Sequence, residues 1–330
     1  MIRRLQTRDK TTSSALQGQA PLLRRGLAAY LALAFGLSWA VQIGLAFALR
    51  HVLGGALVAL GSGMLAVAVL LMWPPAIGAY GERRWVEGGT FSDAGLRWPS
   101  WQFVVLAWLG PPVLTALTAL VSLPLYPFDP TFTLLRELAA RSGQTLPAPP
   151  AVIVGAQLLV ALTLAVPVNA LFAFGEEFGW RGYLLPRLMQ LLGRWPGLLA
   201  HGAIWGFWHA PLIALTGYNY PGHPVLGVPL FVISCALMGV LLGWLQLASG
   251  SVVPPTIAHA SLNAIGGAPL LLLRGVDPAV AGVMYSPAGW AVLLLAIALL
   301  QVTGALSRSL APGAAQACIP GLSIDSPGKG

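Results

Sequence analysis

The sequence predicts an all-α polytopic membrane protein, with about eight transmembrane helices in one bundle around an intramembrane polar cavity. Of its 330 residues, 57% are hydrophobic and 8% are charged, whereas soluble globular proteins carry about 25% charged residues. Several apolar runs are also long enough to cross about 30 Å of hydrocarbon, which takes roughly 20 helical residues. These two observations outweigh the chain length, which alone would permit two soluble domains.

The apolar runs predict the individual spans in order along the chain. Each is bounded by a polar or Pro-rich segment, and its ends are less certain than its existence. The eight predicted spans lie near 26–49, 52–78, 101–125, 151–175, 197–216, 226–248, 252–273 and 286–306. The segment 177–194 has leucines at i, i+4 spacing between arginines, which predicts a helix in the cytoplasmic interface.

The distribution of positive charge predicts the orientation of these spans. With the N-terminus inside, the inner segments hold 14 of the 18 Lys and Arg residues, as expected when positive charge is retained on the cytoplasmic side. We therefore expect a multi-pass protein of the cell membrane with both termini in the cytoplasm. The net charge of +8 does not indicate nucleic-acid binding, because no basic groove interleaved with aromatic residues is present.

A pair of glutamates in FAFGEEFGWRGYLL is the first candidate for chemistry. Ionisable groups within a membrane are costly and mark functional sites by default. Adjacent helical residues diverge by about 100°, so Glu176 and Glu177 cannot share one role. The i, i+4 spacing favours a Glu177–Arg181 pair and leaves Glu176 free to face the bundle interior. Alternatively, all three residues belong to a solvated inner loop.

Two histidines in other apolar runs complete the candidate site. His209 lies among aromatic residues in HGAIWGFWHAPLIAL, and His259 and Asn263 in IAHASLNAIGG share one helical face because they are four residues apart. A single membrane histidine is often an interhelical hydrogen-bond donor. Two on separate helices, beside the glutamate-bearing span, instead indicate catalysis, because imidazole transfers protons near neutral pH.

These groups suggest a hydrolytic mechanism. Glu176 and His209 would activate one water, while Asn263 and His259 would donate hydrogen bonds to the oxyanion that forms. Glu176, His209 and His259 could instead hold Zn²⁺ with an open fourth position, although the sequence contains no HExxH. The rival interpretations are a proton-coupled transporter and a non-catalytic membrane scaffold or immunity protein.

The site requires the helices to depart from straight spans. Counted along the predicted spans, Glu176 lies at the inner surface and His209 lies deeper, a difference of about 15–20 Å at 1.5 Å per residue. Either the fourth span starts later than drawn, or 177–194 dips into the bilayer and the fifth span starts late.

The motifs resemble those of the CPBP (CaaX protease and bacteriocin-processing, or Abi) family of intramembrane proteases. EEFGWR is similar to its EExxxR motif, WGFWH to its aromatic-xxx-His motif, and HASLN to its HxxxN motif; Trp205 stands where Phe is commonest. The order of the three motifs, from about 151 to 273, carries the resemblance. It implies an eight-helix core whose cavity opens to the cytoplasm and bilayer, with Glu176, His209, His259 and Asn263 as the catalytic set.

The resemblance also implies the partners and the organisation of the chain. The substrate is expected to be a peptide or protein, lipidated where it is a prenylated CaaX protein, in contact with membrane lipid. Both metal-dependent and glutamate-dependent chemistry occur in the family, and no cofactor is required by the residues. The expected parts are a flexible basic cytoplasmic lead (1–25), N-terminal transmembrane helices (26–125), an outer loop (126–150), the CPBP-like catalytic core (151–306) and a disordered cytoplasmic tail (307–330).

Overall fold

The computed structural model describes residues 2–51 and 68–310, with side chains described at 21–48 and 68–310. Within these ranges the chain is helical and contains no strand apart from an isolated bridge between Phe128 and Leu273. The all-α prediction is therefore confirmed. The predicted tail beyond residue 310 and part of the second predicted span lie outside the described residues.

The helices follow the predicted runs, with several breaks. In chain order they are α1 (Ile2–His51), α3 (Pro74–Gly81), η2 (Glu82–Val86), α4 (Trp101–Ser122), α5 (Thr133–Arg141), α6 (Pro150–Leu162), α7 (Ala165–Gly179), η3 (Trp180–Leu184), α8 (Leu185–Leu192), α9 (Arg194–Trp208), α10 (Ala210–Thr216), α11 (Pro224–Ser249), α12 (Val253–Ile265), α13 (Ala268–Leu272), α14 (Pro287–Val302) and α15 (Ala305–Ser309). The helix η2 and the helix η3 are single π-helical turns.

Four described helices are long and apolar enough to cross a membrane: Pro21–Ala48, Trp101–Ser122, Arg194–Thr216 and Pro224–Ser249. A fifth span is possible if the bent pair Pro150–Leu162 and Ala165–Leu192 counts as one. The predicted span 252–273 consists of two short helices, α12 and α13, and α14 is shorter than a full span. The protein is thus an all-α polytopic membrane protein in which several predicted crossings are short or broken helices.

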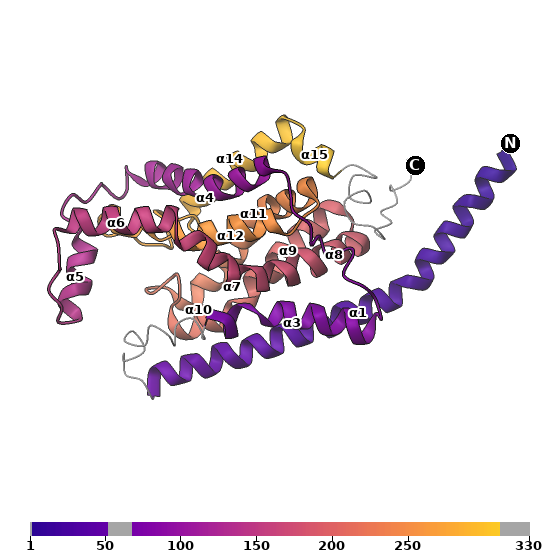
Figure 1. Cartoon of the computed structure of the whole chain (residues 1–330), viewed down its shortest axis with the longest axis horizontal. Coiled ribbons are helices and arrows are strands. Elements are labelled where there is room, and N and C mark those ends of the chain that lie inside the picture. Colours follow the sequence, from indigo (N-terminus) through magenta and orange to yellow (C-terminus); the bar gives the residue numbers. More distant parts are fainter. Residues whose placement is uncertain (1, 52–67, 311–330) are drawn as a thin grey trace.

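The central helices pack side by side (Figure 1). Helix α12 contacts both α7 and α4, α11 packs along α9, and α3 joins α1 to α7. The N-terminal half of α1 projects beyond the other helices (Figure 1), so the segment predicted as a flexible lead continues the first span as one helix. The predicted outer loop contains α5.

The fourth predicted span is bent by 50° between α6 and α7. Thr163 and Leu164 separate the two helices, and Pro167 has no backbone N–H to donate to the Thr163 carbonyl, which interrupts the helical ladder there. After the bend, the chain runs as one helix from Ala165 to Leu192, so Glu176 lies well inside a helix. Glu176 Oε2 lies 2.7 Å from Nε1 of Trp205, one helical turn before His209, so the separation that straight spans would impose between Glu176 and His209 is absent. The segment 177–194 also differs from an interfacial helix, because its residues up to Met189 are buried.

Close approach of α9 and α11 depends on small residues. A Cβ added to Gly202 would lie 2.5 Å from the Cys235 carbonyl oxygen and 2.7 Å from the Ala236 Cα. Such contacts are too short for any side chain, so this glycine permits the two backbones to touch, as small residues do between membrane helices. The contact fixes the position of α9, which carries Trp205 and ends immediately before His209.

Candidate active site

The two glutamates of α7 have different partners, as their divergence on a helix predicts. The predicted pair is present: Arg181 Nη1 donates to Glu177 Oε1 at 2.7 Å, and both side chains are fully buried. Glu176 is 2% exposed, and its Oε2 accepts a hydrogen bond from the indole Nε1 of Trp205 at 2.7 Å. The solvated-loop alternative is therefore wrong for these three residues.

His259 reaches the same cluster from α12. Its Nδ1 donates to Glu177 Oε1 at 2.8 Å, so that one carboxylate oxygen bridges Arg181 and His259. A carboxylate bonded to one ring nitrogen fixes the ring orientation and stabilises a proton on that nitrogen. The Nε2 atom of His259 is thereby left for other partners, while Glu177 and Arg181 hold the ring in place.

His209 lies at the junction of α9 and α10. Its Nδ1 lies 3.0 Å from the Trp205 carbonyl oxygen, and because a carbonyl only accepts, this nitrogen carries the hydrogen. In the neutral ring, Nε2 then has a free lone pair, the form required of a general base. The ring is enclosed by Trp208 and Phe231, with centroids at 4.6 and 4.8 Å.

Trp205 joins these groups. Besides the hydrogen bond to Glu176, its ring lies 5.3 Å from the His259 ring and 6.1 Å from the His209 ring. The Arg181 guanidinium lies over it, 4.3 Å from the ring centroid. Four of the residues predicted from sequence thus surround one indole. The sequence marked Trp205 as a motif position and gave no sign that it would bond to Glu176.

Asn263 is the one predicted site residue without a contact to this cluster. It lies one helical turn after His259 on α12, its side chain is exposed, and within the described part of the chain it makes no side-chain hydrogen bond. Its place on the His259 face leaves its amide available to a molecule that enters the site.

The structure does not arrange the possible Zn²⁺ ligands, Glu176, His209 and His259, as a metal site. Among the described residues, no three His, Cys, Asp or Glu side chains are arranged to hold a metal ion. The residues as placed do not fit a three-ligand Zn²⁺ site, so no step below is routed through a metal.

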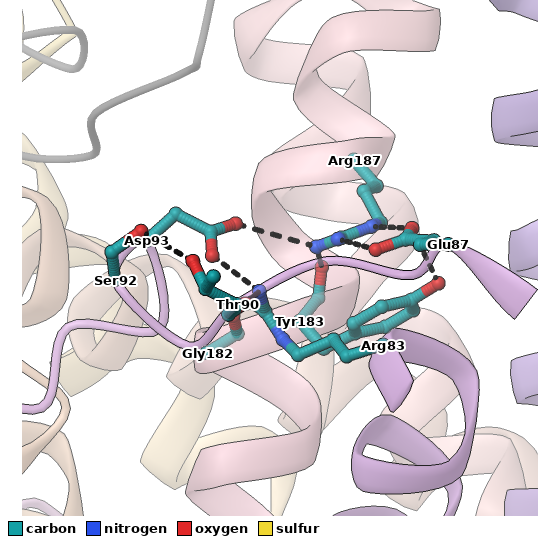
Figure 2. A network of polar contacts seen from close by, with 8 residues as sticks. All are labelled: Arg83, Glu87, Thr90, Ser92, Asp93, Gly182, Tyr183 and Arg187. Carbon is teal, nitrogen blue, oxygen red and sulfur yellow. Dashed lines mark hydrogen bonds and ion pairs between the residues drawn. The ribbon is translucent and has the colours of Figure 1, made fainter. Parts of the chain in front are cut away.

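A polar network supports the end of η3. Arg187 donates from Nε and Nη2 to the two oxygens of Glu87, at 2.8 and 2.5 Å, and Tyr183 Oη donates to Glu87 Oε1 at 3.0 Å. Figure 2 shows this fork-like pairing, with the Arg187 guanidinium 3.7 Å from the Tyr183 ring centroid. Two parallel hydrogen bonds from an arginine to both oxygens of one carboxylate are stronger and more specific in geometry than a single hydrogen bond between neutral groups.

A second arginine fixes the loop that follows η2. Arg83 pairs with Asp93 and donates to the carbonyls of Thr90 and Gly182, the latter at 2.7 Å (Figure 2). Further along, Arg97 Nε donates to the Gly250 carbonyl at 2.7 Å. The segment 82–97 therefore contacts both the helix that carries Glu177 and the turn that precedes α12, and it fixes the two relative to each other.

Comparison with known proteins identifies the part of the chain that carries these residues. Residues 155–265 match the family described as type II CAAX prenyl endopeptidase Rce1-like. This segment, about a third of the chain, is similar to an Rce1-like domain. The matched segment runs from within α6 to the end of α12, and it contains the glutamates, Arg181, Trp205, both histidines of the candidate site and Asn263.

A curated relative matches part of the same chain. CAAX prenyl protease 2 of Methanococcus maripaludis is 30% identical over 92 residues, which cover 27% of this chain and 34% of that protein. The chain therefore aligns with about a third of the relative's length. The first three predicted spans, with the 82–97 segment, lie outside the matched Rce1-like domain.

Proposed function

We propose that the protein is an intramembrane endopeptidase that hydrolyses a peptide bond at the cytoplasmic membrane boundary. The observation that carries the proposal is the convergence of Glu176, His209 and His259 on one indole ring from three separate helices. The Rce1-like match over 155–265 supports a CaaX-type protease, and the charge distribution supports cytoplasmic termini.

The reaction begins with one water molecule between Glu176 and His209. Glu176 accepts one hydrogen bond from the water and His209 Nε2 accepts the other, and the Glu176 carboxylate takes one proton from the water as the oxygen attacks the substrate carbonyl carbon. Asn263 and a doubly protonated His259 donate to the oxyanion of the tetrahedral intermediate. The abstracted proton then passes to the amide nitrogen, and the C–N bond breaks to give an acid and an amine.

Glu177 and Arg181 act through His259. The buried carboxylate holds the His259 ring through Nδ1, and it stabilises the imidazolium form that an oxyanion donor requires. Arg181 balances the remaining charge of Glu177. Neither side chain touches the substrate in this scheme, so both are positioning residues.

The substrate class is a peptide or protein, and the bilayer setting favours one that is itself membrane-bound, such as a prenylated CaaX protein. The test uses purified protein in liposomes with tagged peptides that end in a CaaX sequence, with and without the prenyl group, and with and without a chelator. Cleavage by the wild type that is lost in Glu176→Gln supports the proposal. Ion-gradient-driven flux without cleavage would indicate a transporter, and neither activity would indicate a scaffold; both results contradict it.

A further inference from the structure

The Glu176 carboxylate is held by a single side chain. The Trp205 indole N–H donates to its Oε2 at 2.7 Å, and no other described residue donates to either oxygen. Both side chains are only 2% exposed. In such an environment a hydrogen bond to a charged group is stronger than a neutral one, so this contact decides how the carboxylate is oriented.

The indole itself is held by contacts with three side chains and by the position of its helix. The Arg181 guanidinium covers the ring at 4.3 Å from its centroid, and the His259 and His209 rings lie against it edge-on. One turn earlier, Gly202 brings α9 into backbone contact with α11. Because the ring cannot turn away, the N–H remains directed at Glu176.

We propose that Trp205 is a positioning residue of the active site, whose indole N–H fixes one oxygen of the Glu176 carboxylate and leaves the other to hold the attacking water. This inference rests on the proposed hydrolytic function. A carboxylate held at one oxygen loses its freedom to rotate, and an error of about 1 Å in the position of a catalytic group reduces a rate about 10²-fold. The same N–H also stabilises the charged form that accepts a proton.

Trp205→Phe tests the inference, because Phe keeps an aromatic ring for Arg181 and the histidines but has no donor. Infrared titration follows the carboxyl C=O band of Glu176, assigned by its loss in Glu176→Gln, and does not require activity. Loss of the N–H is expected to move the protonation midpoint of this carboxyl to higher pH by about one to two units. The acidic limb of the pH–rate profile should move by the same amount, and kcat should fall about 10- to 100-fold with little change in KM.

Trp108→Phe is the matched control. It removes an indole N–H that donates to the Leu162 carbonyl at 2.8 Å and to no oxygen of Glu176, and should leave the Glu176 midpoint unchanged. If Trp205→Phe does not fold, the contact is measured in wild-type protein labelled with fluorotryptophan, where Glu176→Gln should shift one ¹⁹F resonance. No shift would overturn the inference.

The outcomes separate this inference from the proposed function. Equal Glu176 midpoints in the wild type and Trp205→Phe would overturn the positioning role whether or not the protein cleaves peptides. A shifted midpoint in a protein that cleaves no CaaX-type peptide would overturn the catalytic part alone. A shifted midpoint with a matching shift of the acidic limb supports both.

Discussion

Glu82 is a buried carboxyl group without a partner, and it makes stability depend on pH. It lies in η2, outside the predicted spans, has no exposed surface, and neither of its oxygens has a hydrogen-bond partner in the described structure. Burial, and then repulsion from Glu87, raise its pKa from 4.5 to about 7, although the nearby Arg187 acts in the opposite direction.

The sign of the effect follows from the two pKa values. Below pH 4.5 the carboxyl is neutral in the folded and unfolded protein and makes no pH-dependent contribution to stability. Between pH 4.5 and about 7 the unfolded chain has lost the proton while the folded protein retains it, so stability declines as the pH rises. Above pH 7 the Glu82 carboxyl is ionised in both states, so the loss of folding stability no longer changes with pH.

The perturbation is Glu82→Gln, which keeps the shape and removes the charge. At 1.36 kcal/mol per pKa unit, the rise from 4.5 to about 7 is worth at most about 3 kcal/mol. Because charges in proteins experience an effective dielectric constant of about 20 even at buried sites, the realised value is about 1–2 kcal/mol. A buried Gln carries its own desolvation cost, but that cost does not depend on pH. The expected result is that the variant gains about 1–2 kcal/mol relative to wild type between pH 4.5 and pH 8.

The assay is urea unfolding in a mild detergent across this pH range, for the wild type and Glu82→Gln. Glu137→Gln is the control, because Glu137 is exposed and its contact with Arg141, at 3.5 Å, is a surface pair. A constant difference between wild type and Glu82→Gln from pH 5 to pH 8 would refute the reasoning.

Two further predictions concern packing and the polar network. Gly202→Ala places a methyl group 2.5 Å from the Cys235 carbonyl oxygen, which should lower the free energy of unfolding by about 1–3 kcal/mol. By displacing α9, it should also slow cleavage about 10²-fold. The control is Gly155→Ala, which has open space around the added Cβ and should change neither stability nor cleavage rate. Arg187→Met leaves the Glu87 carboxylate, whose side chain is 21% exposed, without its charged partner and with only the Tyr183 hydroxyl as a donor. The loss should cost about 1–3 kcal/mol in the same urea assay. Adding Glu87→Gln should recover most of that loss, and a double variant no more stable than Arg187→Met would contradict the pairing.

The helical membrane architecture could be predicted because hydropathy is a local property. The runs near 101–125 and 226–248 correspond closely to α4 and α11. The bend before α7 and the break between α12 and α13 could not be placed, because apolar residues continue through both. Pro167 and the pair Gly266–Gly267 were visible in the sequence, but such residues occur at many positions in spans that stay straight.

The site could be predicted in part. The spacing of Glu177 and Arg181 is enough to predict their pair, since helical geometry fixes it. The bond between Trp205 and Glu176 could not be predicted, because it joins residues on different helices whose relative depth depends on the bend before α7. Likewise, Arg187 and Glu87 are 100 positions apart, and no local pattern in the sequence indicates that they pair.

The central claim is that Glu176 activates the attacking water, and the initial rate of peptide cleavage tests it most directly. Glu176→Gln and Glu137→Gln make the same chemical change at a buried and an exposed glutamate. Reconstituted in liposomes at equal amounts, Glu176→Gln should cleave about 10²- to 10⁴-fold more slowly than wild type, and Glu137→Gln should cleave at the wild-type rate. Equal rates for the two variants would contradict the account.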